Sequence, residues 1–191
     1  MILYVNACVR NESRTDKIAK ALLEKLCDES NLALGDYEEV HLESADIQPL
    51  RRETLAKRDA FVESGDFTDS MFDYAKQFAG ADTIVIAAPF WDFSIPALLR
   101  IYLENIYVVG LTSEYNEQGL PHGLCKAKKL YFVTTAGGPL FPQYGYNYVK
   151  DLAQQAFGIP EVELIKAENL DIIGNNPDAI VEESVKSLHE I

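Results

Sequence analysis

"ILYVNACVRNESRTDKIAKALLEKL", residues 2–26, joins three patterns that together predict the fold. Residues 2–5 are a continuous apolar run with β-branched and aromatic members, which predicts a buried strand. From residue 15 onward, apolar side chains recur every fourth residue, which predicts an amphipathic helix over 15–28. The polar residues 6–15 connect the two. A strand, a loop and a helix in this order form the first unit of an α/β fold.

The same alternation continues to the end of the chain. Further strands are predicted near residues 37–42, 83–88, 130–135 and 162–165, and further helices near 69–80, 96–109, 145–157 and 177–189. Such alternation predicts a parallel sheet with helices on both faces. The second and fifth strands contain charges, as edge strands can, whereas the other three are apolar almost throughout. We therefore expect a flavodoxin-like three-layer sandwich of strand order 2-1-3-4-5, formed by residues 1–191 as one domain.

The predicted order reverses between the first and third strands. Ligands of open α/β sheets bind at such a reversal, beyond the carboxyl ends of the strands. The loops that matter are then residues 6–15 and 88–95, with residues 135–146 beside them.

Composition limits the kinds of partner. The formal net charge of -13 argues against binding to nucleic acid or to an anionic membrane, because both need a basic face. Three separate cysteines and three scattered histidines predict neither a disulfide framework nor a metal site. With no signal peptide or membrane-spanning run in the sequence, we expect a cytoplasmic protein.

The first loop supports three interpretations. Cys8, Arg14 and Thr15 fit Cys-x5-Arg-Thr, the phosphate loop of a phosphatase with a cysteine nucleophile. Ser13 and Asp16 also fit a capping box, in which each residue satisfies the backbone of the other. A helix start surrounded by hydroxyls and arginines can equally hold a bound phosphate, because its N–H groups lack partners. Against the acidic background of the chain, we favour anion binding.

Two further loops suggest a site for a flat ring. The stretch "APFWDFSIPALL", residues 88–99, places three aromatic residues directly after the third strand. They can be core residues, or a wall for a planar ligand. The stretch "TTAGGPL", residues 134–140, has paired glycines that can make a turn or let backbone N–H groups approach such a ligand. Tyr144 and Tyr146 follow and are candidate hydrogen-bond donors to a substrate.

Three segments remain, one that can cover the site, one that can contact a second copy of the chain and one that is a polar excursion. Residues 44–68 are long and charged, and we expect a helix near 51–63 that covers one side of the site. The helix at 96–109 is apolar on nearly all sides, which suits a contact with a second copy of the chain. Residues 110–125 read as a polar excursion with a turn at 117–119.

These stretches together resemble the FMN-dependent NADH-azoreductases and NAD(P)H-quinone oxidoreductases of the flavodoxin-like fold. The resemblance covers essentially the whole chain, and its most specific part is "AAPFWDFSIPALLRIYL", residues 87–103. It implies a homodimer in which FMN is bound by the three loops. The FMN-binding residues implied are Arg10, Ser13, Arg14, Thr15, Pro89, Phe90, Trp91, Asp92, Phe93, Thr135, Ala136, Gly137 and Gly138.

The sequence departs from the family at several of these positions. Azoreductases commonly have Asn in place of Asp92, and Ser-Arg in place of Thr135 and Ala136. Tyr115 is kept as a candidate for the substrate pocket, but Ser113 stands where an aromatic residue is common. The shape of the substrate pocket therefore differs from the family pattern.

The resemblance implies ping-pong transfer of reducing equivalents. NADH or NADPH reduces FMN and leaves, and a quinone, an azo compound or a similar acceptor then takes its place. No essential acid or base is expected in the protein, because the cofactor performs the chemistry. Two alternatives remain: a flavodoxin-type electron carrier, and a low-molecular-weight tyrosine phosphatase that uses Cys8 and Arg14. The phosphatase lacks support because the sequence contains no Asp-Pro to supply its general acid.

Overall fold

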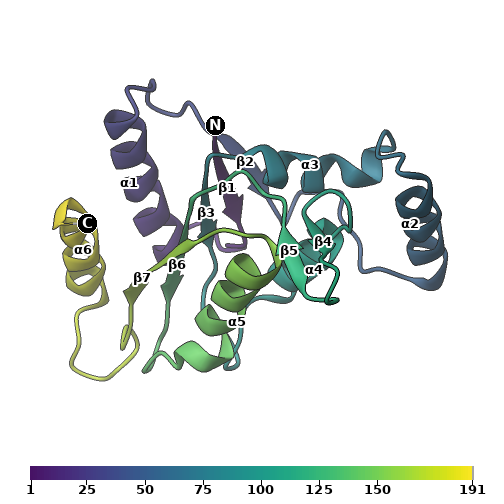
Figure 1. Ribbon diagram of the computed structural model, residues 1–191. Helices are drawn as coiled ribbons and strands as arrows, with labels where there is room; N and C mark the ends of the chain where they lie inside the picture. The colour runs from purple at the N-terminus through teal and green to yellow at the C-terminus, as the bar shows by residue number, and fades with distance from the viewer. Residues whose placement is uncertain (191) are drawn as a thin grey trace.

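The computed structural model describes residues 1–190, and its centre is a parallel five-stranded sheet (Figure 1). The strand order β2-β1-β3-β6-β7 confirms the predicted order 2-1-3-4-5. The strands are β1 Ile2–Asn6, β2 Glu38–His41, β3 Thr83–Ala87, β6 Lys129–Thr135 and β7 Glu161–Ala167. The register pairs Asn6 with both His41 and Ala87, so the loops after these strands leave from one edge of the sheet.

Helices cover both faces of the sheet. The helices are α1 Arg14–Glu29, α2 Arg52–Ser64, α3 Asp73–Gly80, α4 Ala97–Ile106, α5 Tyr146–Asp151 and α6 Pro177–Ser187. In Figure 1, α1 and α6 lie on one side of the sheet, and α3, α4 and α5 lie on the other. Tyr4 of β1 packs into the core beneath α1 and α6, whereas Leu3 and Val5 pack into the opposite core. Alternate side chains of a strand point to opposite faces, so a strand buried on both faces must be apolar throughout.

The helix borders follow local signals in the sequence. Ser13 is the N-cap of α1, and its hydroxyl oxygen accepts a hydrogen bond from the Asp16 N–H at 3.3 Å. Asn176 caps α6 in the same way, with Pro177 at the first helical position. The predicted helix at 145–157 continues from α5 into a π-helical turn, Leu152–Ala156, and that at 69–80 opens with a 3₁₀ turn, Ser70–Phe72.

Two segments differ from their predictions. Residues 110–125 form a two-stranded hairpin, β4 Ser113–Tyr115 and β5 Pro121–Gly123, where only a polar excursion with a turn was expected. Helix α2 forms near the predicted residues but has no buried residue. Figure 1 shows it at the outer end of the molecule, beyond α3 and α4 and far from α1. The expectation that this helix covers the site of its own chain is therefore wrong, because none of its residues lines the cavity described below.

Candidate functional site

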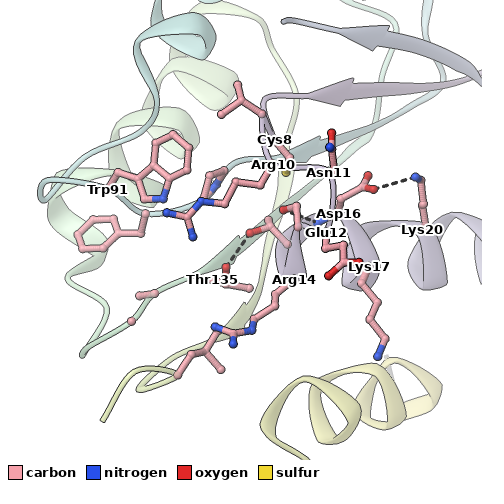
Figure 2. Close-up of a pocket in the computed structure, with 18 of the residues that line it drawn as sticks. Cys8, Arg10, Asn11, Glu12, Arg14, Asp16, Lys17, Lys20, Trp91 and Thr135 are labelled. Carbon is pink, nitrogen blue, oxygen red and sulfur yellow. Dashed lines mark hydrogen bonds and ion pairs between the residues drawn. The ribbon is translucent and has the colours of Figure 1, made fainter. Parts of the chain in front are cut away.

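A cavity of about 1160 Å³ lies at the carboxyl edge of the sheet, at the predicted reversal of strand order (Figure 2). It is lined by all three predicted loops. The lining residues are Cys8 to Lys17, Lys20, Ala21, Glu24, Pro89 to Asp92, Thr135 to Gly137, Leu170, Asp171 and Asp178. The structure thus brings together residues that are more than 100 positions apart in the sequence. Leu170, Asp171 and Asp178 were missed by the sequence analysis.

The first loop ends at the start of α1. The backbone N–H groups of Arg14 and Thr15 donate to no acceptor within residues 1–190, as is usual for the first turn of a helix. Ser13 is half-buried beside them, and Arg10 is exposed. Unpaired N–H groups and nearby guanidinium groups provide donors and positive charge for an anion.

The Asp16 carboxylate is held by partners within the chain, so it does not repel an anion bound at the start of α1. Its carboxylate accepts hydrogen bonds from the Tyr4 hydroxyl at 2.6 Å and from the Asn6 amide at 3.1 Å. It also forms an ion pair with Lys20 at 2.7 Å, visible as a dashed line in Figure 2. The predicted capping box is therefore only half confirmed: Ser13 caps the helix, but the Asp16 carboxylate turns toward the core and toward Lys20. This network ties the first turn of α1 to the end of β1.

Cys8 lies at the bottom of the loop and is buried. Its backbone N–H donates to the Asn6 side-chain oxygen at 3.0 Å. Burial raises the pKa of its thiol to about 11, so the thiolate is scarce at neutral pH. A cysteine phosphatase needs that thiolate as its nucleophile. The burial of Cys8, and the raised pKa that follows from it, therefore argue against the phosphatase interpretation.

The second loop forms a tight hairpin. Trp91 and Ser94 exchange backbone hydrogen bonds at 3.1 Å and 2.7 Å, and the two residues between them have positive φ angles, 49° at Asp92 and 62° at Phe93. Positive φ at both central positions is the signature of a type I′ turn, which usually contains Asn or Gly. The Arg10 guanidinium lies 5.6 Å from the centre of the Trp91 ring and so links the first two loops.

The third loop is tied to the other two through Thr135. Its carbonyl oxygen accepts from the Phe90 N–H at 2.9 Å, and its hydroxyl shares a 2.7 Å hydrogen bond with the Thr15 hydroxyl. Both threonine side chains are buried. The N–H groups of Gly137 and Gly138 donate to no acceptor within the described part of the chain. These two groups are available to a ligand.

A fourth loop, after β7, supports the third. Residues 169–171 donate their backbone N–H groups to the carbonyl oxygens of Gly138, Ala136 and Gly137 in turn, at 2.9, 3.2 and 2.8 Å. Asp171 lies so close to Gly137 that a Cβ there would come within 2.3 Å of its Oδ2. The Arg14 guanidinium also lies 3.4 Å from the Asp171 carboxylate, which links the fourth loop to the first. Acidic residues after the last strand, at the same sheet edge, were the available signal.

The remaining predicted residues lie outside the cavity lining. Gly138 and Phe93 lie next to lining residues, and Phe93 is 61% exposed. Its ring stacks on Phe141, with centroids 5.4 Å apart, and contacts Tyr144, which is itself exposed. The Tyr146 hydroxyl donates to the Val162 carbonyl oxygen at 2.9 Å, so it is used within the fold. We therefore do not carry Tyr146 forward as a substrate donor.

Tyr115, at the end of β4, is also outside the lining. Its side chain is 56% exposed. In the described residues, no three side chains of His, Cys, Asp or Glu are grouped as metal ligands, and no helix is long and apolar enough to cross a membrane.

The residues present fit a phosphate monoester joined to a flat heteroaromatic ring, as in FMN. The first turn of α1 offers free N–H groups with Arg10 and Arg14, which suit the phosphate. Trp91 and Phe90 give an aromatic wall, and the free N–H groups of the glycine pair suit the polar edge of a ring.

Comparison with known proteins points to the same kind of site. A family model described as flavodoxin-like fold matches residues 1–191. The chain is 33% identical to an FMN-dependent NADH:quinone oxidoreductase of Clostridium perfringens, over 97% of this chain and 94% of the relative. It is 34% identical to a protein of the same name from Coprothermobacter proteolyticus, over 100% of this chain and 96% of the relative.

Solved structures share the fold. An FMN-dependent NADH-azoreductase of Bacillus anthracis, solved in complex with FMN, superposes with a TM-score of 0.79. The match covers 99% of this chain and 95% of that structure at 21% sequence identity.

Proposed function

Because this chain belongs to the flavodoxin-like family that includes the FMN-dependent NADH:quinone oxidoreductases, we propose that it carries reducing equivalents from NADH or NADPH to a quinone, an azo compound or a similar acceptor. One observation carries the proposal. A single cavity has an anion-binding end at α1 and an aromatic end with free N–H groups at the second and third loops. This layout matches the two ends of FMN.

The residue roles follow from this layout. Ser13, Arg14 and Thr15 hold the phosphate, and Arg10 assists from across the cavity. Residues 89–93 and 135–138 surround the ring. FMN, when bound, supplies two-electron redox chemistry. The protein binds and orients it, and no side chain of the site has to act as an acid or base.

Trp91 has a further role as a rigid wall. It is only partly exposed, and the Arg10 guanidinium over its ring limits its motion. A wall on one side of the cofactor leaves one face open to reactants. The electron donor and the acceptor must then occupy this face one after the other, which predicts ping-pong kinetics. Tyr144 is exposed beside Phe93 at this rim and is the candidate donor to the acceptor.

We also propose a homodimer that forms through α4. Leu98 and Ile101 pack against the core beside the buried residues of α4 but stay half-buried, so part of their apolar surface is open to a partner. On another side of α4 lies a second cavity of about 330 Å³, lined by Leu50, Arg58, Arg100, Leu103, Glu104, Tyr107, Tyr148 and Leu152. Helix α2, which buries none of its residues within its own chain, is suited to contact the partner. Light scattering coupled to gel filtration tests this directly, since a monomer of 21.4 kDa would contradict it.

We further propose that the protein is cytoplasmic and forms a single domain. The three cysteines Cys8, Cys27 and Cys125 are free thiols, which suits the reducing cytoplasm. Both cores pack on one sheet, which supports a single domain over residues 1–191.

The decisive experiment is spectroscopic. The purified protein, loaded with FMN, should show the yellow flavin spectrum and bleach when NADH or NADPH is added without oxygen. Adding a quinone should then restore the colour. A protein that binds FMN but does not bleach would point instead to an electron carrier, for which the acidic surface is suited. Failure to bind any flavin would refute the proposal.

A further inference from the structure

The glycine loop, residues 136–140, is held in place by the segment that follows β7. The carbonyl oxygen of Ala136 accepts from the Leu170 N–H at 3.2 Å, and that of Gly137 accepts from the Asp171 N–H at 2.8 Å. In a trans peptide, the carbonyl of one residue and the N–H of the next point in opposite directions. These two bonds therefore direct the N–H groups of Gly137 and Gly138 away from the segment that holds the loop.

The far end of the glycine loop has one side-chain anchor. Glu168 accepts a hydrogen bond from the Leu140 N–H at 2.7 Å through its Oε2 atom. Its other carboxylate oxygen pairs with Lys166. The glutamate side chain is 28% exposed, and both contacts hold the pKa of its carboxyl below the usual range, Lys166 more strongly. The carboxylate is thus ionised at neutral pH, and its hydrogen bond to Leu140 is charge-assisted.

The position of this anchor is informative. Pro139 is exposed and has no N–H group through which the loop could be held. Leu140 is therefore the next place where the loop can be fixed after Gly138. Without Glu168, the far side of the glycine pair would be held only by the bond from the Asn169 N–H to the Gly138 carbonyl oxygen, at 2.9 Å. Glycines are flexible, so an end with one anchor in place of two lets the two free N–H groups vary more in direction.

We propose that Glu168 is a positioning residue for the ring end of the cavity, because it fixes Leu140 and so aims the Gly137 and Gly138 N–H groups at the flavin ring. This inference rests on the proposed function. It goes beyond it by giving a role to a residue that does not itself line the cavity. The role depends on an acceptor oxygen that can reach Leu140, not on negative charge.

Three variants separate reach from charge. Glu168→Gln keeps the length and an acceptor oxygen but removes the charge. Glu168→Asp keeps the charge but is one methylene shorter, and Glu168→Ala removes both. Lys166→Ala is the matched control, since it removes the ion pair and leaves the bond to Leu140. Circular dichroism and thermal melting verify that each variant is folded.

The readout is the dissociation constant of the flavin-free protein for FMN and for riboflavin, which lacks the phosphate, measured by flavin fluorescence. We expect Glu168→Asp and Glu168→Ala to weaken both ligands roughly ten-fold, the effect of losing about one hydrogen bond between the ring and the misdirected Gly137 and Gly138 N–H groups. Both Glu168→Gln and Lys166→Ala should stay within about three-fold of the parent protein. An equal loss for both ligands places the effect at the ring end.

Other outcomes overturn the inference. If Glu168→Asp binds normally and Glu168→Gln does not, charge matters and reach does not. If FMN is weakened and riboflavin is not, Glu168 acts on the phosphate. If every folded variant binds both flavins normally, the residue has no role in positioning. A parent protein that binds neither flavin would instead refute the proposed function itself, so the two failures are distinguishable.

Discussion

The two ends of the cavity are built in different ways. At the α1 end, the groups offered to a ligand are the Arg10 and Arg14 side chains and the N–H groups of one helix start. At the ring end, they are aromatic faces and backbone N–H groups, held by bonds between loops that are far apart in sequence. Side-chain donors act singly and can be removed one at a time. Backbone donors act through the shape of the loop, so they are best disturbed by changing what supports it.

The largest expected effect tests the side-chain end. Arg14→Ala should weaken FMN binding by about 10- to 100-fold, because hydrogen bonds to charged groups are worth about 1.5–3 kcal/mol. Riboflavin, which lacks the phosphate, should bind as before. Titration of the flavin-free protein with each ligand measures both constants. Lys128→Ala, an exposed residue before β6 at the opposite sheet edge, is the control with the same charge change. Equal losses for FMN and riboflavin would contradict the assignment of Arg14 to the phosphate.

The second prediction disturbs the ring end through its support. Gly137→Ala should weaken FMN and riboflavin alike, by up to roughly ten-fold, because the new methyl group would lie 2.3 Å from Asp171 Oδ2 and 3.3 Å from its Cβ, so that Asp171 or the loop must shift. Adding Asp171→Ala removes the obstacle and should restore riboflavin binding. Riboflavin is the better ligand for this comparison, since Asp171 also contacts Arg14. If the double variant binds riboflavin no better than Gly137→Ala, the clash is not the cause.

The same contrast explains how much of the structure could be predicted from the sequence. The strand order follows from which strands are apolar throughout and which carry charges, and the structure confirms it. The cavity also lies at the predicted edge, because a parallel sheet places the loops after β1, β3 and β6 together. Ser13 caps α1 as expected, because capping depends on residues close in sequence.

Long-range support could not be predicted in this way. The Thr15–Thr135 hydrogen bond joins residues 120 positions apart, and nothing in either local stretch indicates the pairing. Glu168 and Asp171 follow a strand that itself carries charged residues, so they resemble part of an ordinary polar loop. Tyr146 shows the opposite error. Its place in the sequence suggested a ligand contact, but the register of α5 turns its hydroxyl to the Val162 carbonyl.

A smaller effect, on the stability of the folded protein, is expected from a substitution in the type I′ turn at the ring end of the cavity. Asp92 has φ 49°, a conformation that Asn tolerates well, so Asp92→Asn should stabilise the folded protein by about 0.5 kcal/mol. Urea unfolding of the flavin-free protein measures this. Asp36→Asn, at a residue whose own φ is not positive, makes the same charge change and should have a smaller effect. Equal stabilisation by both would attribute the gain to charge and not to the turn.

The smallest expected effect is at Cys8, which lies on the first loop but offers nothing to either end. Its thiol is buried and its pKa is raised to about 11, so below pH 9 it remains protonated and inert. Cys8→Ser should therefore keep FMN affinity, and the native protein at pH 8 should resist iodoacetamide until it is unfolded. Labelling in urea, where all three cysteines react, is the positive control. Rapid labelling of Cys8 in the folded protein, with loss of activity, would show that Cys8 is a reactive residue of the first loop and would contradict this prediction. If Cys8 resists iodoacetamide, Arg14 and the start of α1 remain the groups that bind the anion, and they hold a phosphate without attacking it.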